Sequence, residues 1–108
     1  MKAIKKGDSV IFKINVKDKN GNIINLTDST FAYSFAKNSF STTTLFSKDL
    51  DSGISIIDAT KGILQISILS TDLDIEPGIY YHECKMTKNS QKRTIFSGKV
   101  VIENSLIG

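Results

Sequence analysis

The 108-residue sequence has few of the side chains from which reactive sites are built: one cysteine, one histidine and no tryptophan. The single cysteine, Cys84, cannot form a disulfide within the chain, so nothing points to an oxidising compartment. The single histidine, His82, leaves no second imidazole to serve a nucleophile, and zinc requires three or four ligands. The composition therefore predicts a protein that is not an enzyme and has no catalytic residues, metal or cofactor.

Long apolar runs and concentrated charge are also missing. No segment approaches the ~20 apolar residues of a membrane span. The basic start, MKAIKKG, leads into an alternating pattern rather than the apolar core of a secretory signal. The net charge is +3, but the lysines are spread out and lie apart from the aromatic residues, unlike a nucleic-acid footprint. We therefore expect no membrane and no nucleic acid as partners, and folding in a reducing cytoplasm.

Apolar side chains recur at every second position along most of the chain, which is the period of a half-buried strand. The segment 30–37 is an example, because Phe31, Tyr33 and Phe35 share one face. The small residues between them share the other face, where they leave room for a neighbour. The same reasoning predicts further strands at 9–17, 23–26, 53–57, 62–69, 78–87 and 93–103.

About seven or eight short strands, with turns every 8–12 residues and no amphipathic helix, predict an all-β antiparallel sandwich or barrel without a disulfide. We expect one domain over residues 1–108, with 1–6 and 104–108 as candidate flexible arms. The polar stretch 38–47 is interpreted as a loop or loose edge. The stretch 70–78 is predicted to hold one helical turn, which Pro77 ends.

The stretch EPGIYYHEC, at 76–84, places His82 and Cys84 near each other with Glu83 between them. The period of two puts Tyr80, His82, Cys84 and Met86 on the inner face, and it turns Glu83 outward. On an inner face a free cysteine behaves as a small hydrophobe, and a neutral histidine needs one partner for a ring nitrogen. We therefore interpret both residues as part of the core rather than as a reactive pair.

Two blocks of the sequence resemble a known family. The first is KKGDSVIFKINVKDKNGNIINLTDSTFAYSF, and the second is GILQISILSTDLDIEPGIYYHECKMT, followed by FSGKVVIE. Their order resembles the small immunoglobulin-like domains of tailed-bacteriophage virion proteins. The likeness is strongest to the N-terminal domain of upper baseplate proteins and to related tail or head accessory domains.

The resemblance implies an immunoglobulin-like sandwich with Greek-key connections. It also implies a structural or assembly role in the virion, in several copies, with other virion proteins as partners. Within it, the pattern Glu76-x-Gly78-x-Tyr80 is similar to the tyrosine corner of such sandwiches, where the tyrosine hydroxyl bonds back to the loop backbone. Gly78 and Tyr80 would form that corner. An alternative function is a carbohydrate- or host-surface-binding module.

Three apolar residues in the polar stretch 38–47 are candidates for a partner interface: Phe40, Leu45 and Phe46. Apolar side chains in a polar loop can anchor in a partner's pocket. They can equally cover the end of the domain's own core. The sequence leaves both interpretations open.

Overall fold

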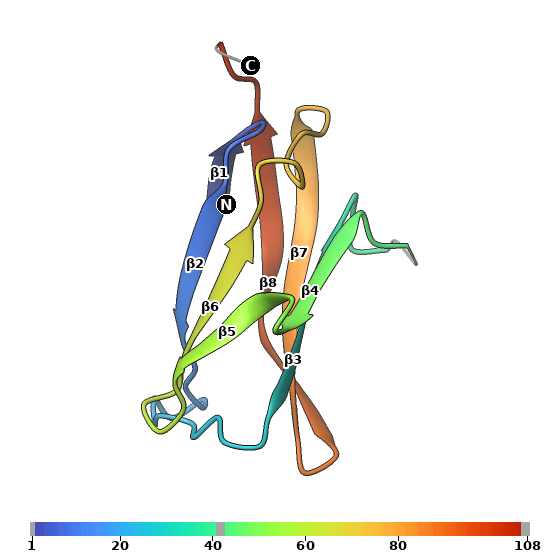
Figure 1. Ribbon diagram of the computed structural model, residues 1–108. Helices are drawn as coiled ribbons and strands as arrows, with labels where there is room; N and C mark the ends of the chain where they lie inside the picture. The colour runs from blue at the N-terminus through green and yellow to red at the C-terminus, as the bar shows by residue number, and fades with distance from the viewer. Residues whose placement is uncertain (1, 41–42, 107–108) are drawn as a thin grey trace.

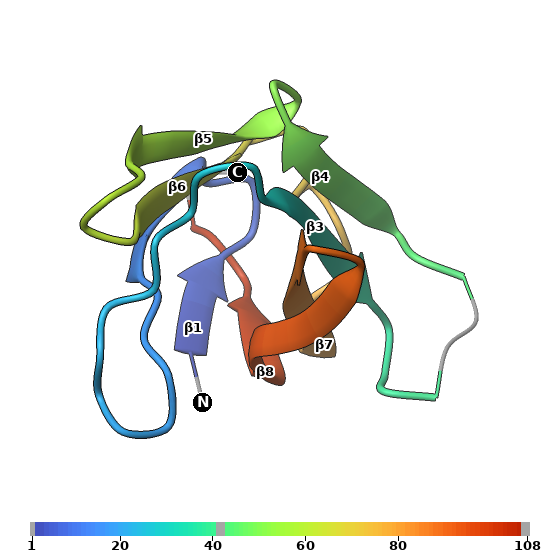
Figure 2. The same ribbon diagram turned by 90° about the horizontal axis from the view of Figure 1, so that it is seen from below.

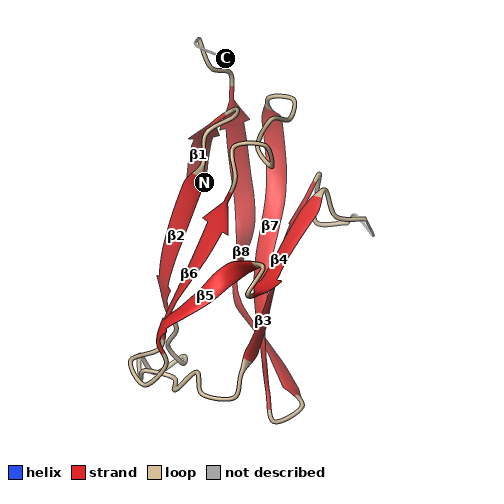
Figure 3. Ribbon diagram, in the orientation of Figure 1, coloured by secondary structure: helices blue, strands red, loops and turns tan. Residues whose placement is uncertain are grey.

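The computed structural model describes residues 2–40 and 43–106, and their regular structure is all β (Figures 1 and 3). The eight strands are β1 (Lys2–Lys5), β2 (Val10–Asn15), β3 (Thr30–Ala36), β4 (Phe46–Leu50), β5 (Gly53–Asp58), β6 (Ile63–Ile68), β7 (Gly78–Lys88) and β8 (Gln91–Glu103). No helix long and apolar enough to cross a membrane occurs in this part of the chain.

The strands form one continuous sheet in the order β1-β8-β7-β3-β4-β5-β6-β2. Seen from below, the sheet curls into a half-barrel, so that β5 and β6 lie across from β1, β8 and β7 (Figure 2). The predicted all-β class without a disulfide is confirmed. The predicted uniformly antiparallel pairing is wrong at two places, because β1 runs parallel to β8 and β4 runs parallel to β5.

The core fills the inside of the curl, where apolar side chains from alternate strand positions meet. Phe31, Tyr33 and Phe35 of β3 are buried, and so are Leu64 and the inward residues that follow it on β6. These are the positions that the period of two predicts to face inward. At about 1.5–3 kcal/mol for each large apolar side chain removed from water, the core can hold the sheet without a covalent link.

The N-terminal segment is a strand rather than an arm. Residues 2–5 form β1, which pairs in register with Val100–Glu103 of β8, and its Ile4 side chain is buried. The local sequence gives no hint of this, because the partner strand lies almost a hundred residues away. Of the arm predicted at 104–108, residues 104–106 follow β8 outside any strand, and residues 107–108 lie outside the described part of the chain.

Two further segments differ from the sequence prediction. Residues 23–26 contain only an isolated bridge, between Lys17 and Ile23. Leu26 is buried, and its N–H donates to the carbonyl of Ala59 at 2.9 Å. Of the loop predicted over 38–47, residues 41–42 lie outside the described part of the chain, and the loop ends earlier than predicted because Phe46 begins β4.

The segment after β6 contains turns and no helical residue. Asp72 explains why, because its carboxylate accepts the N–H of Leu69 at 2.9 Å and closes a tight turn. The same oxygen, Oδ2, also binds the ammonium of Lys48 at 2.7 Å, with both side chains largely buried. This ion pair ties the connection between β6 and β7 to β4.

Candidate functional site

Cys84 is fully buried at the centre of β7, and that burial raises the pKa of its thiol to about 12. At neutral pH the group is therefore a protonated thiol surrounded by protein. It lies on the predicted inner face, and its surroundings disfavour the thiolate that a nucleophile or metal ligand requires.

His82 is half-buried, and its ring lies edge-on among aromatic side chains. The ring centroids of Phe12, Tyr33 and Phe96 are 5.9, 5.7 and 5.0 Å from that of the imidazole. The hydroxyl of Tyr33 lies 3.0 Å from the Nδ1 atom of His82, within hydrogen-bond distance. His82 is thus a packing residue with a polar contact. Among residues 2–40 and 43–106, no group of three histidine, cysteine or acidic side chains could hold a metal ion.

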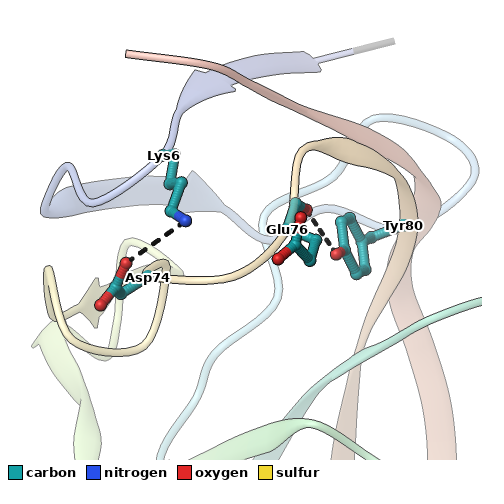
Figure 4. A network of polar contacts seen from close by, with 4 residues as sticks. All are labelled: Lys6, Asp74, Glu76 and Tyr80. Carbon is teal, nitrogen blue, oxygen red and sulfur yellow. Dashed lines mark hydrogen bonds and ion pairs between the residues drawn. The ribbon is translucent and has the colours of Figure 1, made fainter. Parts of the chain in front are cut away.

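Tyr80, at the start of β7, has the corner geometry that the sequence resemblance implies. Its hydroxyl donates to the backbone carbonyl of Glu76, four residues earlier, at 2.5 Å (Figure 4). A Cβ placed on Gly78 would lie 3.9 Å from the Tyr80 ring, an ordinary contact, so the ring alone does not require glycine there. The ammonium of Lys6 lies 3.7 Å from Asp74 and ties the same connection to the end of β1.

A shallow trough of about 330 Å³ lies on the outer face of β3 and β7. Its floor is built by the small residues of β3, and the pairing register puts a longer side chain of β7 beside each of them. The three opposed pairs are Ala32 with Lys85, Ser34 with Glu83, and Ala36 with Tyr81. The trough therefore exists because one strand presents small side chains where its neighbour presents large ones.

The loop between β3 and β4 forms one wall of the trough, with Asn38, Ser39 and Thr44 lining it. Phe40 belongs to this loop and is 90% exposed. Its N–H donates to the Asn38 side-chain oxygen at 2.9 Å, which fixes the turn that carries the phenyl ring. Burying this ring against a partner would remove a large apolar surface from water.

The three apolar residues proposed as an interface have different roles. Phe46 stacks on Phe35 with ring centroids 4.8 Å apart, so it covers the core of its own domain. Leu45 is half-exposed and Phe40 is almost fully exposed. Phe40 and Leu45 are therefore the exposed members of the three, and Phe46 anchors the loop to the sheet.

The polar groups of the trough include one local ion pair, between Lys85 and Glu83 at 3.5 Å. Tyr81 adds a half-buried aromatic ring to the wall. The alternation of small residues on β3 could be read from the sequence, and so could the outward direction of Glu83. Which strand lies beside them could not, because that depends on the order of strands in the sheet.

No model of a protein family matches the sequence, and no curated protein matches it either. The chain is therefore characterised by its fold and its surface: a curled eight-stranded sheet with an exposed phenylalanine beside a trough of small side chains.

Proposed function

We propose that the chain is a non-enzymatic assembly protein of a tailed-bacteriophage virion, present in several copies and acting through protein–protein interfaces. It would be made in the bacterial cytoplasm and incorporated into the particle as a baseplate, tail or head accessory component. Its partners would be other virion proteins and further copies of itself.

An immunoglobulin-like sandwich is the finer fold that we propose for the curled sheet. Two features support it. The connection from β6 to β7 crosses from one wall of the curl to the other, as a Greek-key connection does. The Tyr80 hydroxyl bonds back to Glu76 at the end of that connection, as a tyrosine corner does.

The observation that carries the proposal is the position of Phe40. A phenylalanine that is 90% exposed, on a turn held by Asn38, is costly to leave in water and useful to bury in a partner. The trough supplies a concave surface bordered by polar groups, and it is lined by Asn38 and Ser39, the two residues that precede Phe40. A projecting aromatic residue beside a hollow of small side chains suits a multicopy interface.

The test is the substitution Phe40→Ser, compared with Ile57→Ser. Ile57 lies on β5 and is about half exposed, so its replacement removes a surface apolar group away from the trough. Tagged chains are expressed during phage production, and their copy number per purified particle is measured by quantitative mass spectrometry. We expect the Phe40 variant to be depleted about tenfold and the Ile57 variant to be incorporated normally.

If both variants were incorporated equally, Phe40 would not be part of the interface. Absence of the unmodified chain from purified particles would overturn the virion assignment. Circular dichroism of both variants checks that the sheet is intact, since neither side chain belongs to the core.

A carbohydrate- or host-surface-binding module is the second candidate, and the composition of the trough favours it. Tyr81 presents an aromatic ring there beside Asn38, Glu83 and Lys85, which could hydrogen-bond sugar hydroxyls. A glycan array probed with the unmodified chain and with Tyr81→Ala separates the two. Selective binding that Tyr81→Ala abolishes would support the second candidate over assembly.

A further inference from the structure

The curled sheet is not closed, and two of its strand edges face a common groove. β2 is an edge strand that pairs only with β6. β8 pairs with β1 only over Val100–Glu103, so its first nine residues, 91–99, have no neighbour on that side in the described part of the chain. We call the region between β2 and residues 91–99 the seam.

The upper continuation of the seam is already filled by an extended segment. There β1 lies along β8, adds four residues to the sheet and buries Ile4 in the core. Figure 1 shows β1 beside the upper end of β8 only, with the lower part of β8 extending beyond it. Directly above the seam, the molecule therefore shows how a short extended segment adds to β8 and contributes a side chain to the core.

The seam itself is a groove of about 560 Å³ whose lining is more apolar than polar. Phe12 and Ile14 of β2 form one side, and His82 and Phe96 form the other. Phe12, Ile14 and Phe96 are partly buried and pack against the core. Side chains of an incoming strand that point inward would rest on these residues and extend the core.

The backbone of β2 can receive such a strand. Val16 donates its N–H to the Gly62 carbonyl at 2.7 Å, toward the β6 side. Backbone groups alternate in direction along a strand, so every second residue before Val16 also faces β6. The intervening residues Ile11, Lys13 and Asn15 direct their N–H and C=O groups toward the seam.

The charges around the seam select the partner. Four cations line it: Lys13 in the groove, and Lys17, Lys19 and Arg93 in the adjoining hollow below. Asp18 is the one carboxylate among the described residues that line these two hollows, and it accepts the N–H groups of Asn20 and Asn22. None of the four cations forms an ion pair within 4.0 Å with a described residue, and Arg93 interacts electrostatically with Asp18 at longer range.

We propose that the seam is a strand-acceptor site, in which β2 pairs with an extended, acidic segment of another protein whose apolar residues alternate with polar ones. The segment would lie in the seam below β1, and it would pair with β2, whereas β1 pairs with β8. Main-chain hydrogen bonds to Ile11, Lys13 and Asn15 would give affinity, and the four cations would select acidic residues. This site is distinct from the trough and does not depend on Phe40.

The test uses the intact chain and labelled nine-residue peptides in which valine alternates with glutamate or serine. Fluorescence anisotropy measures the Kd of this peptide and of a version with lysine in place of glutamate. Two further peptides carry N-methyl groups, either on the valines or on the residues between them. Because only every second N–H of an added strand points to β2, we expect one N-methylated peptide to bind and the other to lose at least tenfold in affinity.

The protein variant Lys13→Glu/Arg93→Glu should weaken binding of the acidic peptide at least tenfold, and the matched control Lys37→Glu/Lys61→Glu should not. Equal binding of the two N-methylated peptides would overturn strand pairing. If polyglutamate bound as tightly as the alternating valine–glutamate peptide, the seam would be a nonspecific basic surface and the proposal would be wrong. A third outcome would also overturn the proposal: the unmodified chain is a dimer and binds no peptide, and the Lys13→Glu/Arg93→Glu variant is a monomer. The edge of β2 would then pair with a second copy of the chain.

Discussion

Because the thiol of Cys84 is buried, the stability of the fold should decrease at alkaline pH. Burial raises its pKa from about 9 to about 12, and burial also raises the pKa of the Tyr33 hydroxyl. Above pH 9 the unfolded chain releases the Cys84 proton while the folded chain retains it, so the unfolded state gains stability. We expect the free energy of unfolding to fall between about pH 9 and pH 12. Urea denaturation at a series of pH values measures this.

Cys84→Val is the matched variant for the alkaline prediction, because valine is apolar, similar in size and does not titrate. Its stability should fall less steeply above pH 9, by up to about 1.4 kcal/mol per pH unit, the linkage of one proton. An identical pH dependence in both proteins would show that Cys84 is not the responsible group.

The hydroxyl of Tyr80 contributes one hydrogen bond whose loss should be measurable. Tyr80→Phe keeps the ring and removes the bond to the Glu76 carbonyl, so we expect the free energy of unfolding to drop by about 1 kcal/mol. Tyr81→Phe, on the outer face of the same strand, should change it by less than about 0.5 kcal/mol. Chemical denaturation of the three proteins compares them, and equal stability of all three would argue against a stabilising corner.

His82 shows how far single residues could be predicted from the sequence. The period of two correctly places it on the inner face with Tyr80 and Cys84. It cannot predict that Cys84 is fully buried while His82 lines the seam groove. That difference arises because the curled sheet stays open beside β2, a property of the tertiary arrangement rather than of β7.

At the scale of elements, the turn between β5 and β6 depends on Gly62. Its φ is +69°, and an added Cβ would lie 2.7 Å from the Ile24 carbonyl oxygen and 2.9 Å from that of Val16. Backbone atoms cannot give way as a flexible side chain can. We therefore expect Gly62→Ala to lower the free energy of unfolding by about 2 kcal/mol or more, measured by urea denaturation.

Gly21→Ala separates the two causes of the Gly62 effect. Gly21 also has a positive φ, +83°, but an added Cβ there would meet nothing within 4 Å. Gly21→Ala should therefore lower the free energy of unfolding by about 1 kcal/mol, from the backbone conformation alone. If Gly21→Ala proved as damaging as Gly62→Ala, the close approach of the two carbonyls would not be the reason.

Elements with a regular period were predictable, and those fixed by distant contacts were not. The inward faces of β3 and β6 follow directly from their alternating side chains. The pairing of β1 leaves no local pattern because it depends on β8. The acidic residues after Ser70 and Thr71 predict a helical turn, but the structure has none there. The ion pair of Asp72 with Lys48, far away in sequence, accompanies the turn that forms instead.

At the scale of the molecule, the open edge of β2 should be visible in hydrogen exchange. Amides of Ile11, Lys13 and Asn15 point to the seam and should exchange quickly, whereas that of Val16, bonded to Gly62, should exchange slowly. β6 lies between β5 and β2, so consecutive amides there should all be protected. NMR-detected exchange resolves the pattern, and uniform protection along β2 would mean that its edge is covered.

The strand order, and with it both proposed binding sites, lay beyond sequence reasoning. The trough requires β7 beside β3, and the seam requires β2 and β8 to be near each other without pairing. Neither relation leaves a local pattern in the chain. The sequence could supply the exposed Phe40 and the small face of β3, but not the surfaces that they would form together.

The parallel pairing of β1 with β8 has a mechanical consequence. Lys2 lies opposite Val100 and Lys5 lies opposite Glu103, so the beginning of β1 and the end of β8 are at opposite ends of the pair. Tension that draws these two ends apart acts along both strands and loads their hydrogen bonds in shear, all at once rather than one after another. Under such tension, the paired β1 and β8 strands would resist the force more than other parts of the sheet.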